Sequence, residues 1–373
     1  MANSDSEVLV IGGGLVGTAV ACGLARLGQR VTVLDEGDIA HRASRGNFGL
    51  VWVQSKGFGV PEYQRWTRRS ADEWAGFSDE LQQETGIASG HEQPGGVTIC
   101  LSEEELERRR GRMAQLHLEA GETRFEYEML DHAALKKLIP AIGPEVAGAS
   151  FTPYDGHANP LYTLRALHAS LLRHGGRYVP NARVEAIDAR PGDFRLSAGG
   201  QVYAAPKLVL AAGLGNRALG ARVGLHVPVR PVRGQIIVTE RMQPVLAMPT
   251  LMIRQTVEGT IMIGESREET GFDDTTTPEI VHTLAERAVK TFPFLRHARI
   301  VRSWGALRVM SPDGLPIYEQ SVQYPGAFVC TCHSGVTLAA AHARHYARYV
   351  VEGQLPAELA RFSTARFDVQ AAA

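Results

Sequence analysis

The chain has 373 residues, of which 44% are hydrophobic and 21% charged, and its formal net charge is −1. This length suits about two domains with a sizeable core. The charge argues against nucleic acid as a partner, because phosphate binding needs a surplus of Lys and Arg. Four cysteines are too few for a disulfide scaffold. The first residues, MANSDSE, lack the basic region of a signal peptide. We therefore expect a cytoplasmic chain without a transmembrane segment.

The first forty residues predict one strand–helix–strand unit. Residues 8–13 (VLVIGG) form a short apolar run, as expected of a parallel strand buried on both faces. Residues 15–28 carry apolar side chains at helical spacing and end at Gly28, which is typical of a helix C-terminus. Residues 30–36 (RVTVLDE) predict a second buried strand.

Glycines at the first turn indicate a dinucleotide site. Gly12, Gly14 and Gly17 have the G-x-G-x-x-G spacing between strand and helix. That pattern allows a tight turn, close approach of backbone to a pyrophosphate, and close helix–strand packing. Asp35 ends the second strand, where an acid would accept hydrogen bonds from a ribose. These residues alone leave NAD and FAD open.

Later segments complete the expected architecture. The charged run at 102–121 predicts a helix with a solvated face, and residues 157–176 predict a turn at Asn159 followed by a helix. Alternating or apolar runs at 227–241, 250–259 and 260–266 predict an antiparallel sheet.

Four further segments resemble the D-amino-acid oxidase-like superfamily of FAD oxidoreductases, which includes glycine oxidase and sarcosine oxidase. They are the loop at 43–52 (ASRGNFGLVW), the strand at 182–189, the segment at 207–216 that contains Ala212 and Gly213, and the block at 303–343. The resemblance implies FAD as cofactor. It assigns cofactor binding to Gly12, Gly14, Leu15, Val16, Gly17, Asp35, Glu36, Ser44, Asn47, Gly49, Leu50, Val184, Ala212, Gly213, Gly305, Gly335, Val336 and Thr337.

The same resemblance implies the fold class. We expect an α/β fold, with a Rossmann-type FAD-binding domain interleaved with an antiparallel-sheet α+β substrate domain, as in glycine oxidase. The FAD-binding domain is assigned to residues 1–80, 151–226 and 303–373, and the substrate domain to residues 81–150 and 227–302.

Three residues are candidates for contact with the substrate. Arg308 matches the family arginine that holds the substrate carboxylate, although pairing with Asp313 at a turn is an alternative. Arg254 lies in the expected substrate sheet, where it could equally be a solvated strand residue. His333 opens the loop before the expected last helix, where it could touch the ring or substrate or be satisfied by backbone. In that loop, N–H groups of residues 335–338 would stabilise a reduced flavin.

Cys330, Cys332 and His333 form a C-x-C-H cluster, but no complementary cysteine pair exists, so we predict no metal site. Covalent flavin attachment through a cysteine occurs in some relatives. Met310 follows Arg308 in a region where no cysteine is present, so we expect non-covalent FAD.

The segments around residues 45, 305 and 331 are most similar to FAD-binding β subunits of bacterial heteromeric dehydrogenases. This group includes D-hydroxyproline dehydrogenase, the B subunit of opine oxidase and the cyanide-forming glycine dehydrogenase. The similarity implies hydride transfer from a small amino acid or secondary amine carboxylate to flavin N5, which gives an imine. It also implies partner subunits that accept electrons, with attachment to the inner membrane only through such partners. A self-sufficient oxidase producing hydrogen peroxide and a flavin-carrying assembly subunit remain alternatives.

Overall fold

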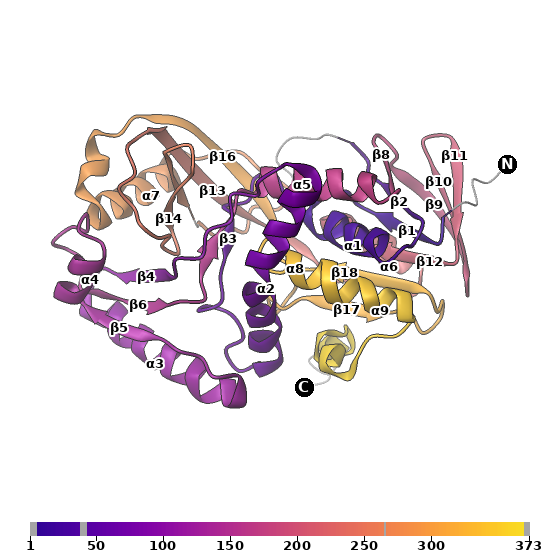
Figure 1. Cartoon of the computed structure of the whole chain (residues 1–373), viewed down its shortest axis with the longest axis horizontal. Coiled ribbons are helices and arrows are strands. Elements are labelled where there is room, and N and C mark those ends of the chain that lie inside the picture. The colour runs from indigo at the N-terminus through magenta and orange to yellow at the C-terminus, as the bar shows by residue number, and fades with distance from the viewer. Residues whose placement is uncertain (1–5, 38–42, 265, 369–373) are drawn as a thin grey trace.

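The computed structural model describes residues 6–37, 43–264 and 266–368. We expect MANSDSE to lack the basic region of a signal peptide, and most of these residues, 1–5, lie outside the described ranges. The molecule is elongated, with a sheet-and-helix layer structure at one end and antiparallel sheets at the other (Figure 1).

A six-stranded sheet has the order β17–β18–β12–β1–β2–β8. Its strands are β1 (Val8–Ile11), β2 (Val31–Leu34), β8 (Arg177–Val179), β12 (Lys207–Leu210), β17 (Ile317–Gln320) and β18 (Ala327–Thr331). All neighbours are parallel except β17 and β18. β1, β2 and β18 are buried along their whole length, which explains why they are continuous apolar runs.

Helix α1 (Leu15–Arg26) packs on this sheet, beside α5 (Pro160–Arg173). Its buried side chains include Val20, Ala21 and Leu24. Gly28 follows the helix with φ +79°, as predicted for a C-terminal glycine. Asn159 caps α5 by accepting hydrogen bonds from the N–H groups of Leu161 and Tyr162, which confirms the predicted turn.

The predicted antiparallel sheet is present and has the order β14–β15–β13–β16. It consists of β13 (Arg230–Arg241), β14 (Ile253–Gln255), β15 (Thr260–Gly264) and β16 (Ile300–Met310), with α7 (Pro278–Thr291) packed on it. Because β16 pairs with β13 from residue 300 to residue 310, residues 303–310 belong to this sheet. The expected domain boundary at 303 therefore cuts a strand in two, and the division into domains stays a prediction.

A three-stranded sheet of order β4–β6–β5 lies beside it, in the region where sequence patterns indicated only helices. Its strands are β4 (Gly96–Cys100), β5 (Glu128–Asp131) and β6 (Gly148–Thr152), and α3 (Glu103–Ala120) and α4 (His132–Leu138) connect them. The long α2 (Pro61–Thr85) packs against α5, α3 and the short α8 (Ala339–Ala341) (Figure 1).

Smaller elements complete the fold: β3 (Leu50–Val51) pairs with β7 (Gly156–His157), and β9 (Val184–Arg190), β10 (Asp193–Ala198) and β11 (Gln201–Ala205) form a meander. A short helix, α6 (Asn216–Ala221), follows β12. The expected last helix begins at α8 (Ala339–Ala341), passes through a π-helical turn at His342–Tyr346 and ends as α9 (Ala347–Glu352). A short α10 (Ala365–Asp368) follows. Among the helices of the described ranges, none has the length and apolar content needed to cross a bilayer.

Candidate functional site

The first turn has the tight geometry that its glycines predict. Gly12 has φ +108°, and a Cβ there would come within 2.5 Å of the Ala211 carbonyl oxygen. A Cβ on Gly17 would collide with the carbonyl oxygen of Gly12, so this glycine lets α1 pack directly on the end of β1. Both positions therefore exclude any side chain.

The start of α1 presents backbone N–H groups at the carboxyl edge of the sheet. Leu15 N–H donates to the Ser44 hydroxyl at 2.9 Å, which brings the loop after residue 43 to the helix N-terminus. A Cβ on Gly14 would lie 2.8 Å from that hydroxyl oxygen. A phosphate group placed here would meet the positive end of the helix dipole.

Asp35 lies beside this turn, at the end of β2. Its carboxylate accepts hydrogen bonds from the N–H groups of Gly13 (2.7 Å) and Gly37 (3.0 Å). The carbonyl oxygen of Asp35 also accepts a bond from Ala182 N–H, which places Val184 close by. Glu36 pairs with Arg183 at 3.8 Å on the surface. The structure thus brings the predicted ribose and adenine residues together.

A cavity lies next to the loop that follows residue 43. Its empty space is about 920 Å³, part of it open to solvent. The walls combine the predicted residues Asn47, Leu50, Arg308, His333, Val336 and Thr337 with Trp52, Ser55, Lys56, Gly234, Leu251, Cys332 and several neighbours. Its wall combines apolar and polar side chains, as in many small-molecule sites.

Arg308 contributes a guanidinium group to this cavity. Its Nη1 donates to the carbonyl oxygens of Ser266 (2.7 Å) and Arg233 (3.2 Å). Gly234 is required for this placement, because a Cβ there would lie 2.5 Å from Arg308 Cζ. Asp313, the alternative partner, instead pairs with Arg366 at 2.7 Å.

The strand neighbours of Arg308 hold its two carbonyl partners in place. Arg233 is 3% exposed and pairs with Glu268 and Asp273, each at 2.6 Å. The Ser266 hydroxyl donates to Glu268 and accepts from Gln235 N–H, so the segment after β15 is tied to β13. The two carbonyl groups that accept hydrogen bonds from the Arg308 guanidinium are thus held in place.

Arg254 supports the cavity from behind. It is 2% exposed, its Nε donates to the Phe48 carbonyl oxygen, and its Nη2 contacts Met262 Sδ. Burial lowers its pKa to about 10. Phe48 lines the cavity, whereas Arg254 is absent from the described lining. Arg254 therefore acts on the cavity through the backbone of the Asn47–Gly49 turn.

That turn is itself well defined. The Asn47 side-chain oxygen accepts a hydrogen bond from Gly49 N–H at 2.7 Å. Gly49 has φ +92°, and a Cβ there would approach Arg254 Nη2 to 2.8 Å. The segment ASRGNFG at residues 43–49 thus forms a turn that faces the cavity on one side and Arg254 on the other.

His333 lies in the cavity wall directly after β18. Burial lowers the pKa of His333 well below its usual value. The charges of Lys56, Arg308 and Arg267 lower it further. The imidazole is therefore neutral at physiological pH, and the charged groups around it are cations.

The turn before α8 joins two distant parts of the chain. The Thr337 hydroxyl accepts a hydrogen bond from Trp52 N–H (3.1 Å) and donates to the Leu50 carbonyl oxygen (3.2 Å). Trp74 Nε1 donates to the carbonyl oxygens of Val336 and Thr337. A Cβ on Gly335 would contact Val16 on α1 at 3.2 Å. This turn is held between the cavity and the start of α1.

A buried polar network fixes the other side of the cavity loop at 52–56. The Asp155 carboxylate is fully buried and accepts bonds from Val53 N–H (2.5 Å) and Gln54 Nε2 (2.6 Å). Arg109 donates to the Gln54 side-chain oxygen (2.6 Å) and to the Ser150 hydroxyl (2.7 Å). Sequence patterns did not indicate this network, because its members lie on four separate segments.

The remaining predicted cofactor residues lie around the site. Ala212 and Gly213 follow β12, where Ala212 N–H donates to Asn216 and Gly213 has φ +57°. Gly305 is one residue before the lining residue Ala306, but a Cβ on it would meet the Asp274 carbonyl oxygen at 2.4 Å. We infer that Gly305 serves strand packing more directly than cofactor contact.

The sequence patterns assign no role to several cavity residues, among them Trp52, Ser55 and Gly234. An isolated glycine within an apolar strand signals close approach of another group, and that signal is present at Gly234. Cys332 lines the cavity, while Cys330 is fully buried in the core. In the described ranges, no three His, Cys, Asp or Glu side chains gather in a way that could hold a metal.

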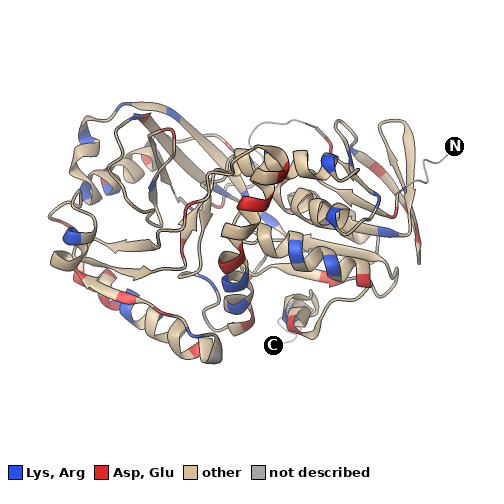
Figure 2. Cartoon of the chain, in the orientation of Figure 1, with Lys and Arg blue, Asp and Glu red and all other residues tan. Residues whose placement is uncertain are grey.

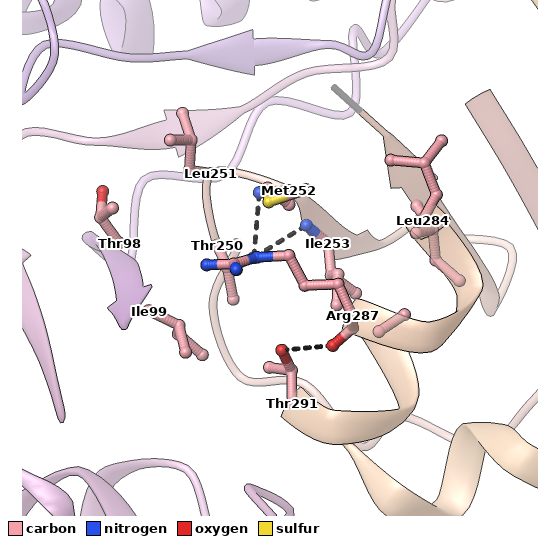
Figure 3. Close-up of a pocket in the computed structure, with 11 residues that line it drawn as sticks. Thr98, Ile99, Thr250, Leu251, Met252, Ile253, Leu284, Arg287 and Thr291 are labelled. Atoms are coloured by element: carbon pink, nitrogen blue, oxygen red, sulfur yellow. Dashed lines mark hydrogen bonds between the residues drawn. The ribbon is translucent and has the colours of Figure 1, made fainter. Parts of the chain in front are cut away.

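A second, smaller cavity of about 460 Å³ lies between β4, the turn at 250–253 and α7 (Figure 3). The Thr250 hydroxyl accepts bonds from Met252 and Ile253 N–H, and the Thr291 hydroxyl donates to the Arg287 carbonyl oxygen. Arg287 forms a bidentate salt bridge with Glu105. Leu251 lines both cavities and forms a wall between them.

Acidic and basic residues are interspersed along several helices (Figure 2). On α3, Arg108 pairs with Glu104 and Arg110 with Glu107. The charged run at 102–121 is thus a solvated helix face, as predicted, except for the buried Arg109.

These features fit FAD. The glycine turn and the helix N-terminus suit a pyrophosphate, Asp35 ends β2 where an acid could accept hydrogen bonds from a ribose, and the cavity begins where the isoalloxazine would follow. The chain would hold the cofactor with Gly12–Gly17, Asp35, Ser44, the Asn47–Leu50 turn and the Gly335–Thr337 turn.

Comparison with known proteins agrees with this fit. A model of the family "FAD dependent oxidoreductase" (DAO) matches residues 7–349. The B subunit of opine oxidase from Agrobacterium tumefaciens (strain Ach5) is 44% identical over 99% of both chains, and that from Rhizobium meliloti is 43% identical with the same coverage.

Among solved structures, glycine oxidase from Geobacillus kaustophilus superposes with a TM-score of 0.86 at 25% identity, covering 96% of this chain and 98% of that one. The expected glycine oxidase-like α/β fold, with its parallel sheet and antiparallel sheets, is thereby confirmed. The chain belongs to the DAO family of FAD-dependent oxidoreductases.

Proposed function

We propose that this enzyme oxidises the C–N bond of a secondary amine that carries carboxylates, of the opine type, to the imine. The observation that supports this most directly is the Arg308 guanidinium, fixed over Gly234 at the wall of the cavity. Lys56 adds a second cationic side chain to the same wall. The 44% identity to one chain of an opine oxidase, over nearly the whole length, supports the substrate class.

The bound flavin supplies the hydride acceptor. The chain's own residues bind and orient the substrate: Arg308 is suited to hold one carboxylate through two parallel hydrogen bonds. The neutral His333 can accept or donate a hydrogen bond without adding a charge near the amine. Trp52, Leu251 and Val336 add apolar surface to the cavity wall, which would help to exclude water around a bound substrate. Arg254 is proposed to position the Phe48 backbone rather than to touch substrate.

We further propose that FAD is bound non-covalently. Cys332 is the cysteine of the described cavity wall, and burial raises its pKa to about 12, which disfavours the nucleophilic thiolate. Acid precipitation should release all the flavin into the supernatant. Yellow colour that stays with the pellet would contradict this proposal.

We propose that the chain is the catalytic subunit of a heteromeric enzyme in the cytoplasm, with partner subunits as electron acceptors. The two opine oxidase relatives support this arrangement, because each is named as one subunit of its enzyme. D-hydroxyproline, D-proline and glycine are alternative substrates, supported only by the family resemblance.

The test is anaerobic addition of an opine, D-hydroxyproline, D-proline, glycine and sarcosine, each to the purified yellow protein. Loss of the flavin absorption with the opine alone supports the proposal, and loss with another compound replaces the substrate. Repeating the reactive case in air separates dehydrogenase from oxidase, since an oxidase releases hydrogen peroxide. Bleaching only after co-expression with partner chains would identify a flavin-carrying assembly subunit.

A further inference from the structure

Trp52 combines almost complete burial with an unused hydrogen-bond donor. Its side chain is 2% exposed and lines the cavity. Its indole Nε1 is buried and has no hydrogen-bond partner among the described residues. A buried N–H group without a partner is costly, and native structures contain few of them. This donor therefore calls for an acceptor that the described part of the chain does not provide.

The indole ring contacts Gly96, and hydrogen bonds anchor the backbone at residues 52 and 53. A Cβ on Gly96 would lie 2.6 Å from Trp52 Cζ3 and 2.7 Å from Cη2, so the six-membered edge of the ring rests on the Gly96 backbone. The backbone N–H of Trp52 donates to the Thr337 hydroxyl, and the backbone N–H of Val53 donates to the Asp155 carboxylate. The pyrrole edge that carries Nε1 therefore faces away from Gly96.

The proposed substrate offers a suitable acceptor for this donor. The charged side chains of the described cavity wall are Lys56 and Arg308, and both are cations. His333 is neutral because burial and neighbouring cations lower its pKa. The proposed substrate carries carboxylates, and carboxylate oxygens accept charge-assisted hydrogen bonds from N–H groups.

We propose that Trp52 Nε1 donates a hydrogen bond to a carboxylate oxygen of the substrate and is a specificity-determining residue. This inference rests on the proposed function, because it requires a carboxylate-bearing substrate. Trp52 and Lys56 come from the same loop, whereas Arg308 comes from β16. A substrate with two carboxylates would then be held from two different parts of the chain.

The probe is diglycolate, an ether with two carboxylates that lacks an amine and so cannot form an imine. Its binding to the FAD-loaded enzyme is followed by the change in flavin absorption, with the uncharged diglycolamide as comparison. Trp52→Phe keeps a buried aromatic ring and removes only the N–H donor. We expect its affinity for diglycolate to fall about tenfold, because one hydrogen bond to a charged group is lost.

Trp66→Phe is the matched control. Trp66 is also buried, at 3% exposure, but its Nε1 donates to Tyr318 at 3.1 Å and it lies outside the cavity wall. This variant should lose thermal stability because Tyr318 loses a partner, while its diglycolate affinity stays unchanged. Trp52→Phe should lose less stability, because the indole N–H that it removes makes no hydrogen bond within the described ranges.

Equal diglycolate affinity in wild type and Trp52→Phe would overturn the inference and leave the proposed function intact. Weaker FAD binding by Trp52→Phe, with unchanged diglycolate affinity, would also overturn it by assigning the donor to the flavin. If wild type itself fails to bind diglycolate, both this inference and the carboxylate recognition in the proposed function fail.

Discussion

The guanidinium of Arg308 lies against the backbone of Gly234, at a point where any Cβ would approach Arg308 Cζ to 2.5 Å. The two residues belong to neighbouring strands, with Gly234 opposite Ala306 in the register of β13 and β16. The space for the cation is thus created by the absence of a side chain on the adjacent strand.

Gly234→Ala should therefore displace the Arg308 guanidinium without changing any charge. We expect the Kd for diglycolate to rise at least about tenfold, because the cation can no longer meet a carboxylate in fixed geometry. FAD content should remain near that of wild type, since the dinucleotide turn is elsewhere. Gly111→Ala on α3 is the control, because a Cβ there meets nothing. Unchanged ligand affinity in Gly234→Ala would mean that Arg308 does not hold the carboxylate.

Arg254→Met should weaken the enzyme through the cofactor loop. It removes the bond to the Phe48 carbonyl oxygen, and loss of a charged hydrogen bond typically costs about 2 kcal/mol. We expect lower flavin occupancy after purification and a lower Tm. Arg241→Met, at the exposed end of β13, should change neither. If instead only the KM for substrate rises, Arg254 contacts the substrate directly.

His333 should not produce an ionisation step in the activity profile. Burial and cationic neighbours lower its pKa well below the usual value, so the neutral form persists through the physiological range. We expect kcat/KM against pH, from about 6 to 8, to have the same shape in wild type and His333→Gln. In this variant kcat/KM should fall by less than about tenfold, because the loss of one hydrogen bond accounts for a change of that size. The prediction would be wrong if kcat/KM of the wild type changed with pH near the usual histidine pKa and this change were absent in His333→Gln.

Asp155 should make stability fall with rising pH. Burial raises its pKa to about 7, although hydrogen bonds from Val53 and Gln54 and the charge of Arg109 oppose the shift. The folded state therefore holds this proton more tightly than the unfolded state, where the pKa is about 4. The resulting stability is fully present below pH about 4 and is lost as pH rises to about 7, by at most about 1.4 kcal/mol per pH unit.

The measurement is the unfolding free energy of wild type and Asp155→Asn at several pH values across that window. The variant cannot ionise, so the difference between the two proteins should change as pH rises and become constant above about 7. Parallel curves would show that Asp155 does not titrate in this range.

Short-range patterns are enough to predict the dinucleotide turn. The roles of Gly12 and Gly17 follow from one strand and the next helix, so the spacing alone determines the geometry. Arg308 can be identified because it lies in register with a family pattern. The glycine pattern at Gly234 signals a close approach but does not name Arg308 as the partner. The place of Trp52 cannot be predicted in this way, because it depends on a contact with Gly96, which lies far away in sequence.

The differences between the expected and the observed fold have a similar origin. The strands β4, β5 and β6 are four or five residues long and lie between strongly helical segments, so their pairing is not visible in local periodicity. The family pattern places residues 303–310 in the FAD-binding domain, whereas their hydrogen bonds run to β13.

The contact of Thr337 with Leu50 and Trp52 has a consequence for the synthesis of the protein. The cavity wall includes residues 332–337, and β18 lies between β12 and β17 inside the six-stranded sheet. A nascent chain therefore cannot close the flavin pocket until nearly its whole length has left the ribosome. Cofactor binding then requires nearly complete translation. Truncated products that lack residues 332–337 should be colourless, even if their first strands fold.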